Sequence, residues 1–208
     1  MIIGVCGLMD SGKSTIGKFL VANGSIPLAF GGAVKDAVAN IFAWDRLMLE
    51  GDTPESRDWR EQKDEFWSEK LGYDITPRYS LQLMGTEAGR KVFGDNLWIN
   101  SVRAQMKDPN RSYVITDCRF PNEADAIREW GGSVIMVRRG EIPYWYTDAT
   151  NNEMDKHPDI HASEYSVAQC HYDYLIKNDG TKQELNQKIR RIVSEILLTN
   201  YNKCGSME

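Results

Sequence analysis

The sequence predicts an α/β protein with three layers, in which helices cover a five-stranded parallel sheet that carries a helical insertion and a lid. Three observations predict this fold. Five short apolar runs have the length of strands, a glycine-rich loop joins the first run to a helix, and one charged, aromatic stretch lacks strands. We expect one domain, with a core at 1–43 and 107–208, the helical insertion at 44–106 and a lid-like segment at 140–162.

The glycine-rich loop follows the apolar run 1–6 and matches the phosphate-loop pattern G-x-x-x-x-G-K-[ST]. Its glycines allow main-chain N–H groups to turn inward around a phosphate, and the following helix adds the positive end of its dipole. Lys13 is expected to reach the terminal phosphates, and the Ser14 hydroxyl to ligate magnesium. A glycine-rich turn without a ligand is the alternative. The expected nucleotide-binding residues are Gly7, Asp10, Ser11, Gly12, Lys13, Ser14 and Thr15.

Composition narrows the classes of function. The 208 residues include 25 Lys and Arg against 30 Asp and Glu, a formal net charge of −5, which argues against a protein that binds nucleic acid polymers. No apolar run is long enough to span a bilayer, and the N-terminus enters a polar loop instead of a signal sequence. We therefore expect a soluble, cytoplasmic protein that does not bind membranes.

The cysteines do not have metal-type pair spacing, so we expect thiols in a reducing compartment. A zinc ion held by three histidines and a cysteine is a second interpretation, but Pro158 disrupts the helical geometry of the first histidine pair. Scattered polar surface residues are therefore favoured. The cysteines are Cys6, Cys118, Cys170 and Cys204, and the zinc candidates are His157, His161, Cys170 and His171.

A second strand is predicted at 26–30, and Gly31-Gly32 then turns the chain into a helix with apolar residues at helical spacing from Val34 to Phe42. Lys35 lies in the first turn of this helix, where the dipole disfavours a cation. Contact with a phosphate explains this position, and a solvated surface lysine explains it as well.

Within the insertion, Thr53-Pro54 predicts one helix to about Lys70, with Trp59, Phe66 and Trp67 on its apolar side. A second helix begins at Thr76-Pro77 and is interrupted at Gly85-Thr86, and a third covers about 96–106. Arginines of this region can bind phosphate in a forked geometry, and an amide and an indole can hold a base. Pairing of the arginines with carboxylates and burial of the tryptophan in the core are the alternatives. The residues concerned are Arg78, Gln82, Arg90 and Trp98.

The third strand begins near Ser112 and delivers Asp117 to its C-terminal end, the edge at which open α/β sheets bind ligands. Beside a phosphate loop, Asp117 can hold magnesium or accept a hydroxyl proton, whereas a structural role would be to cap the next turn. Arg119 is a candidate for binding the phosphoryl acceptor, and Arg138, after a fourth strand at 133–137, for stabilising transferring phosphate.

The rest of the chain predicts a lid, a strand and a helix. Residues 141–162 are polar with little periodicity, as in a lid. A last strand is expected at 172–177, and Thr181 and Glu184 form a capping box for an amphipathic helix. The helix is expected to pack on the sheet through Leu185, Ile189, Ile192, Val193, Ile196 and Leu197, and 200–208 to be a fraying tail.

Five segments spread over the chain combine into one pattern: Gly7 to Ser14, Leu81 to Glu87 with Arg90, Asp117 to Glu123, His161 to Glu164 and Ile176 to Gly180. Together they resemble the bacteriophage deoxynucleoside monophosphate kinases, a branch of the P-loop kinases that is also similar to the animal phosphomevalonate kinases. The combination Gln-x-x-Gly-Thr-Glu with Asp-x-Arg-Phe-x-Asn-Glu is the most specific part. One departure is Leu8-Met9-Asp10, which replaces a basic residue often found in the loop.

This resemblance implies a P-loop kinase fold and phosphoryl transfer from ATP, with Mg2+, to a deoxynucleoside monophosphate. It implies no nucleic acid or membrane partner, leaves a homodimer open, and places a phage-encoded enzyme in the host cytoplasm. The implied catalytic residues are Lys13, Asp117, Arg119 and Arg138, with Ser14 and Asp117 at the metal. The implied substrate-binding residues are Lys35, Arg78, Gln82, Thr86, Arg90, Trp98, Arg119 and Glu123.

Two other functions stay open at this point. The same fold could phosphorylate another small phosphorylated acceptor, such as a phosphomevalonate-like compound or a cofactor precursor. A nucleotide-sensing protein or GTPase-like switch is the other. Against the switch, no Asp-x-x-Gly follows the strand of Asp117, and Asn178 does not belong to an Asn-Lys-x-Asp sequence.

Overall fold

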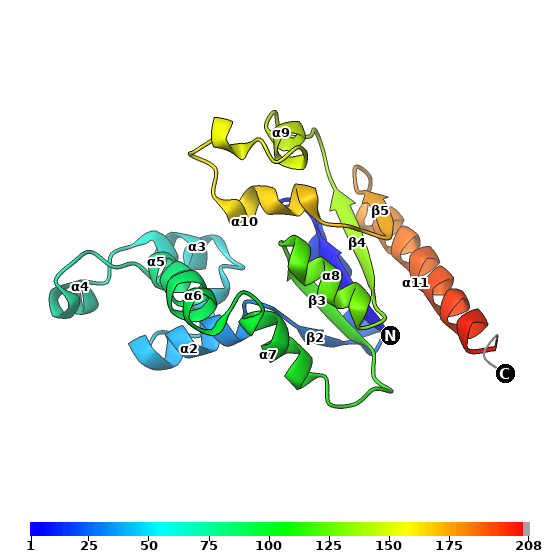
Figure 1. Cartoon of the computed structure of the whole chain (residues 1–208), viewed down its shortest axis with the longest axis horizontal. Helices are drawn as coiled ribbons and strands as arrows, with labels where there is room; N and C mark the ends of the chain where they lie inside the picture. Colours follow the sequence, from blue (N-terminus) through cyan, green and yellow to red (C-terminus); the bar gives the residue numbers. More distant parts are fainter. Residues whose placement is uncertain (206–208) are drawn as a thin grey trace. The chain divides into compact units, whose positions relative to one another are not determined.

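The computed structural model describes residues 1–205, without the side chains of residues 163, 200 and 203–205. The chain forms two compact units. The core unit comprises Met1–Ala29 and Met106–Glu208, and the helical unit comprises Phe30–Gln105. In Figure 1 the strands belong to the core unit, and the helical unit is formed by helices and loops.

The core unit is built on five parallel strands in the order β2-β3-β1-β4-β5. Because all five strands are parallel, their C-terminal ends lie at one edge, where the phosphate loop follows β1 and Asp117 lies near the end of β3. The five predicted strands are confirmed, each within about two residues. They are β1 Ile2–Cys6, β2 Ile26–Leu28, β3 Tyr113–Cys118, β4 Ser133–Arg138 and β5 Tyr174–Lys177.

Helices cover both faces of the sheet and give the three predicted layers. Ile3 and Val5 of β1 point into a buried core shared with α1 (Lys13–Ala22) and α11 (Lys182–Gly205). Gly4, between them, faces the opposite layer, where a Cβ would lie 2.4 Å from Cδ1 of Ile127. That layer is α8 (Pro121–Glu129), which the sequence analysis did not identify although proline at its first position is a helix signal.

The predicted capping box of α11 is confirmed, since Glu184 Oε2 accepts the Thr181 N–H at 2.7 Å and Thr181 Oγ1 accepts the Glu184 N–H at 3.2 Å. Leu197 was expected on the packed face but is 53% exposed, whereas Ile196 in the same turn is 3% exposed and belongs to the core. The expected tail was wrong for residues 200–205, which continue the helix, and its last three residues lie outside the described part.

The helical unit begins at Phe30 instead of residue 44. The reason is that α2 (Gly32–Phe42) joins the segment after it, through ion pairs of Lys35 with Glu50 and of Asp36 with Arg46. The other elements are η1 Met48–Glu50, α3 Pro54–Glu61, α4 Glu65–Leu71, α5 Pro77–Gln82, the π-helix η2 Leu83–Arg90, α6 Lys91–Phe93 and α7 Leu97–Gln105.

Two predicted helices of this unit differ from the structure. The helix expected at 54–70 is two helices, because Asp64 has an extended backbone and its carboxylate accepts the N–H of Trp67, which starts α4. As a result Phe66 is 60% exposed instead of packed. The expected interruption at Gly85-Thr86 is absent, since α5 continues directly as a π-helix to Arg90.

The lid-like segment contains more structure than its polar sequence suggested. It includes α9 (Tyr146–Thr150) and η3 (Met154–Lys156), and α10 (Ala162–Tyr165) and η4 (Ser166–Gln169) follow. Tyr146 and Met154 are buried and anchor these turns. The expected thiols are confirmed for Cys6, Cys118 and Cys170, whereas the side chain of Cys204 is outside the description. None of the helices in residues 1–205 is both long and apolar enough to cross a membrane.

Candidate functional site

The phosphate loop at the end of β1 has a backbone conformation that requires glycine at two positions. Gly7 and Gly12 have φ of 149° and 111°, and Asp10 has φ of 55°. A Cβ on Gly7 would lie 2.3 Å from the carbonyl oxygen of Val137, and one on Gly12 would lie 2.4 Å from Nδ2 of Asn178. Side chains at these positions would therefore force the loop apart, and the main chain of a loop with this conformation can form an anion cradle.

Lys13, the first residue of α1, lies across this loop. Its Nζ donates to the carbonyl oxygens of Gly7 at 2.9 Å and Leu8 at 2.6 Å. Burial, helped by the positive charge of Arg119, lowers the pKa of Lys13 to about 8, although Asp10 and Asp117 act in the opposite direction. The ammonium group is thus partly desolvated and gains from an additional anion close to it.

The same loop offers oxygen atoms suited to phosphate chemistry and to a hard cation. Ser11 is 2% exposed, and its Oγ has no hydrogen-bond partner among the described residues. Ser14 is exposed at the start of α1, while Asp117 lies near the end of β3 and affects the pKa of Lys13. Hydroxyl and carboxylate oxygens are the ligands that Mg2+ prefers, so Ser14 and Asp117 fit the ion.

Arg119 and Glu123 follow β3, and the structure changes the expectation for Glu123. Its side chain is 3% exposed, and Oε2 accepts the N–H groups of Arg119 at 2.9 Å and Phe120 at 3.1 Å. Glu123 therefore closes the start of α8 instead of contacting a substrate, because a carboxylate at the third helical position reaches back to the cap. Arg119 is exposed and is held in place through its own backbone.

Arg138, the last residue of β4, has a partner that sequence reasoning missed. Its Nη2 donates to the hydroxyl of Tyr146 at 3.2 Å, and its guanidinium carbon lies 5.2 Å from the centre of that ring. Burial raises the pKa of Tyr146 despite the nearby arginine, so the phenol stays neutral. Tyr146 belongs to α9, and its only sequence signal was an aromatic residue within a polar lid. The lid segment thus contacts a candidate catalytic residue.

The histidines proposed for zinc are not gathered. His157 Nε2 lies 2.8 Å from a carboxylate oxygen of Asp148, and His171 Nδ1 lies 3.2 Å from one of Asp125. Over the described residues, no group of three or more His, Cys, Asp and Glu side chains is arranged to hold a metal ion.

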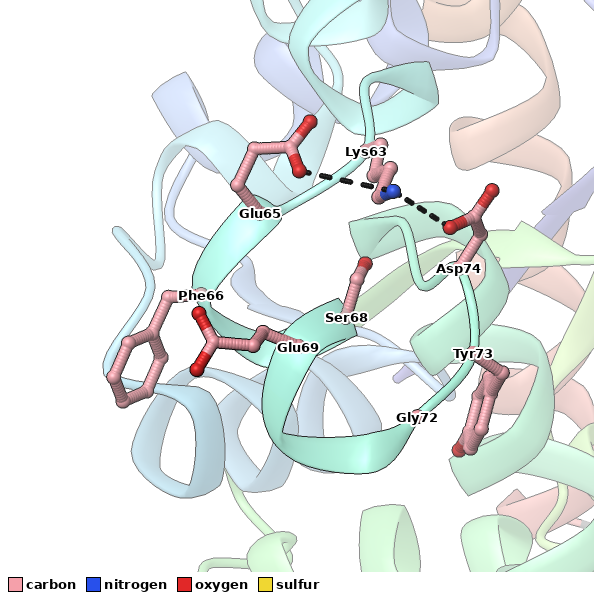
Figure 2. Close-up of a pocket in the computed structure, with 8 residues that line it drawn as sticks. All are labelled: Lys63, Glu65, Phe66, Ser68, Glu69, Gly72, Tyr73 and Asp74. Atoms are coloured by element: carbon pink, nitrogen blue, oxygen red, sulfur yellow. Dashed lines mark ion pairs between the residues drawn. The ribbon is translucent and has the colours of Figure 1, made fainter.

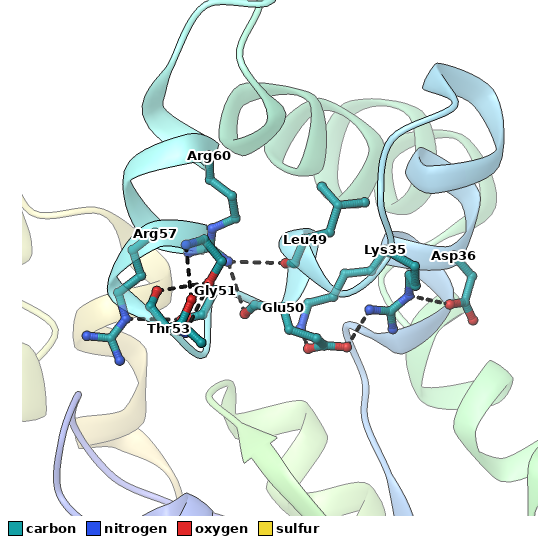
Figure 3. A network of polar contacts seen from close by, with 10 residues as sticks. Lys35, Asp36, Leu49, Glu50, Gly51, Thr53, Arg57 and Arg60 are labelled. Atoms are coloured by element: carbon teal, nitrogen blue, oxygen red, sulfur yellow. Dashed lines mark hydrogen bonds and ion pairs between the residues drawn. The ribbon is translucent and has the colours of Figure 1, made fainter.

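In the helical unit, the cation Lys35 is already paired. It donates to Glu50, which also accepts from Arg46, and Arg46 in turn bonds Asp36 (Figure 3). Burial alone would raise the pKa of Glu50, but Lys35 and Arg46 outweigh burial and lower it. The solvated lysine of the alternative interpretation is therefore not observed. Glu50, which sequence reasoning missed, sets the charge around Lys35.

Four expected substrate residues lie along α5 and the π-helix at intervals of four residues. Such spacing places side chains on one side of a helix. Gln82 and Thr86 are exposed, Arg90 is partly buried, and Arg78 forms an ion pair with Glu61. The row therefore offers an amide and a hydroxyl between two arginines, and Arg78 is held by a carboxylate.

Trp98 packs against the π-helix that carries part of this row and does not present a ring face to a base. It is 9% exposed, and its indole Nε1 donates to the carbonyl of Gly85 at 2.8 Å. A Cβ on Gly89 would lie 2.4 Å from the tryptophan ring, so glycine is required there. Because the indole packs against the π-helix, the interpretation of Trp98 as a core anchor holds and base contact by its ring is wrong.

The helical unit also has a surface pocket around α4 (Figure 2). Lys63 lies between Asp74 and Glu65, at 2.7 and 3.7 Å from their carboxylates, and Glu69 adds a further negative charge. With three carboxylates and one lysine among its lining residues, this pocket disfavours a phosphate group. It is not the acceptor site that the sequence analysis predicted.

Residues 55–189 of the chain match the deoxynucleotide monophosphate kinase family. The chain belongs to this family. It is thus a nucleoside monophosphate kinase, and the P-loop kinase fold expected from the resemblance is confirmed.

Three relatives are consistent with this assignment. A putative deoxynucleotide monophosphate kinase of Acanthamoeba polyphaga mimivirus is 28% identical over 205 residues, 91% of this chain and 94% of the relative. A deoxynucleoside-5'-monophosphate kinase of Escherichia phage T5 is 45% identical over 56 residues, 26% of this chain and 22% of the relative. A deoxynucleotide monophosphate kinase of Escherichia phage RB69 is 29% identical over 120 residues, 56% and 44% of the two chains.

Proposed function

We propose that this kinase transfers the γ-phosphoryl group of ATP to the phosphate of a deoxynucleoside monophosphate, giving a deoxynucleoside diphosphate and ADP. The observation that carries the proposal is the phosphate loop, in which Gly7 and Gly12 have positive φ and Lys13 lies across the loop. Such a loop binds the phosphates of a nucleoside triphosphate.

The core unit supplies most of the catalytic groups in this proposal. Lys13 binds the β- and γ-phosphates, and Ser14 and Asp117 would hold Mg2+, which when bound would neutralise phosphate charge. Arg119 binds the acceptor phosphate, and Arg138 stabilises the charge that spreads over the transferring group. Positioning and charge stabilisation suffice, since phosphoryl transfer needs little covalent chemistry from the protein.

The helical unit binds the acceptor nucleotide in this proposal. Gln82 and Thr86 contact the base and sugar, while Arg90 and Arg78 bind phosphate, Arg78 after exchanging Glu61 for it. Lys35 contributes positive charge in balance with Glu50. Trp98 and Glu123 act through the backbone that they hold.

Residues 140–162 act as a lid that excludes water during transfer, because water in an open site would hydrolyse ATP. The contact between Tyr146 and Arg138 supports this role, since it joins the lid segment to a residue of the phosphoryl site. ATP and nucleoside monophosphates are cytoplasmic metabolites, so we place the enzyme in the cytoplasm, that of the host if a phage encodes it.

A coupled ADP-release assay over the four common deoxynucleoside monophosphates tests the proposal. Ribonucleoside monophosphates and a phosphorylated acceptor without a base, such as phosphomevalonate, serve as controls. Turnover with at least one deoxynucleotide, and less with both controls, is the expected result. If no deoxynucleotide is phosphorylated while phosphomevalonate is, the proposed acceptor is wrong.

A further inference from the structure

Asn178 is the residue directly after β5, and the proposed mechanism gives it no role. It is 7% exposed, although asparagine is a polar residue that is mostly found at the surface. A buried amide must find hydrogen-bond partners, and the identity of those partners shows what the residue does.

The side chain of Asn178 reaches the phosphate loop across 167 residues of sequence. Its Nδ2 donates to the carbonyl oxygen of Ser11 at 2.8 Å. The same Nδ2 lies against Gly12, where a Cβ would come within 2.4 Å of it. The amide of Asn178 therefore holds the peptide group between Ser11 and Gly12, directly before Lys13. It occupies the space in which a side chain at position 12 would lie.

The backbone around Asn178 holds a second part of the donor site. The N–H of Asn178 donates to the carbonyl oxygen of Arg138 at 2.7 Å, and the carboxylate of Asp179 accepts the N–H of Gly140 at 2.8 Å. The turn after β5 thus contacts both the phosphate loop and the exit of β4, which carries Arg138 into the lid segment.

We propose that Asn178 is a positioning residue for the triphosphate site, which fixes the Ser11–Gly12 peptide so that the loop N–H groups converge on phosphate. This inference rests on the proposed function only for the identity of the donor. In a trans peptide the C=O and the following N–H point in opposite directions. When Asn178 holds the Ser11 carbonyl away from the cradle, the N–H of Gly12 is therefore directed toward it. Pre-ordering the loop lowers the entropy that phosphate binding must overcome.

Two substitutions test the hydrogen bond. Asn178→Asp keeps the shape but places a carboxylate oxygen against the Ser11 carbonyl, and Asn178→Ala removes the amide. We expect each to raise the Kd for ATP, measured by calorimetry, and the KM for ATP by roughly tenfold, the effect of one lost hydrogen bond. The KM for the deoxynucleoside monophosphate should change less than twofold, because the helical unit provides most of that site.

The control is Ile189→Val. It removes a methylene group from the buried core between the sheet, α1 and α11 and leaves the hydrogen bond of Asn178 unchanged. It should lower Tm by a few degrees and leave both KM values unchanged. The inference is overturned if either Asn178 variant binds ATP like the wild type. It is also overturned if a variant raises both KM values together, as general loosening of the fold would. If the wild type binds ATP but phosphorylates no nucleotide, the proposed function fails, and ATP affinity alone decides the role of Asn178.

Discussion

The phosphate loop of the core unit and the cations Lys35 and Arg78 of the helical unit differ in the partners that their positive groups already have. The loop conformation depends on Gly7 and Gly12, and Lys13 is bonded only to carbonyl oxygens in the contacts described. In the helical unit, Lys35 and Arg78 already have carboxylate partners in Glu50 and Glu61. A backbone site binds an anion without prior exchange, whereas a side-chain site of this kind exchanges one anion for another.

This difference predicts that the loss of the loop cation has the largest effect. Lys13→Ala should lower kcat/KM for ATP by about 10²- to 10³-fold, because the charge that meets the terminal phosphates is removed. Steady-state kinetics at saturating acceptor measures this change. Lys18→Ala, which removes an exposed lysine from the same helix, should have almost no effect. Equal activity of both variants would contradict a role for Lys13.

A test of the backbone itself compares two glycines with positive φ. Gly12→Ala should weaken ATP binding by about 10- to 100-fold and destabilise the fold by about 1–3 kcal/mol, because its Cβ would clash with Asn178. Gly24→Ala has a φ of 93° but no atom within 4 Å of its Cβ, so strain alone remains, about 1 kcal/mol. Calorimetry and urea unfolding measure the two effects. Similar ATP affinities would show that the loop tolerates the clash.

The pKa of Lys13, about 8, predicts how ATP binding depends on pH. Below pH 8 the ammonium is charged and binds phosphate, and above pH 8 the free protein loses that charge, so Kd should rise by up to about tenfold per pH unit. The bound phosphate raises the pKa of Lys13, so binding near pH 8 should take up protons. Calorimetry in buffers of different ionisation enthalpy measures this uptake. Lys13→Ala should lack it.

The smallest effect is expected in the helical unit. Glu50→Gln removes the counter-charge of Lys35 and Arg46, so the KM for the deoxynucleoside monophosphate should fall by about two- to fivefold while that for ATP stays constant. Glu61→Gln is the matched change at Arg78, and the larger of the two decreases identifies the cation that meets the acceptor. If the acceptor KM is unchanged in both variants, these cations lie outside the acceptor site.

The sequence predicted the loop better than the roles of Trp98 and Glu123, because the two kinds of signal differ in range. Gly7, Gly12 and Lys13 act within eight consecutive residues, and the backbone conformation they require is local. The role of Trp98 depends on a hydrogen bond to Gly85, and that of Glu123 on whether a helix begins at Pro121. The spacing of Trp98 fitted both a core anchor and a base contact, and only burial distinguished the two.

By itself, the sequence determined the five strands, the phosphate loop and the family. Local patterns suffice for these features, because strand periodicity and glycine conformations are properties of short segments. Only the tertiary structure decided which cations are neutralised, that Tyr146 meets Arg138, and that Asn178 holds the Ser11 carbonyl. The physical reason is that hydrogen bonds and ion pairs act over a few ångströms, and only folding brings such distant residues within that range.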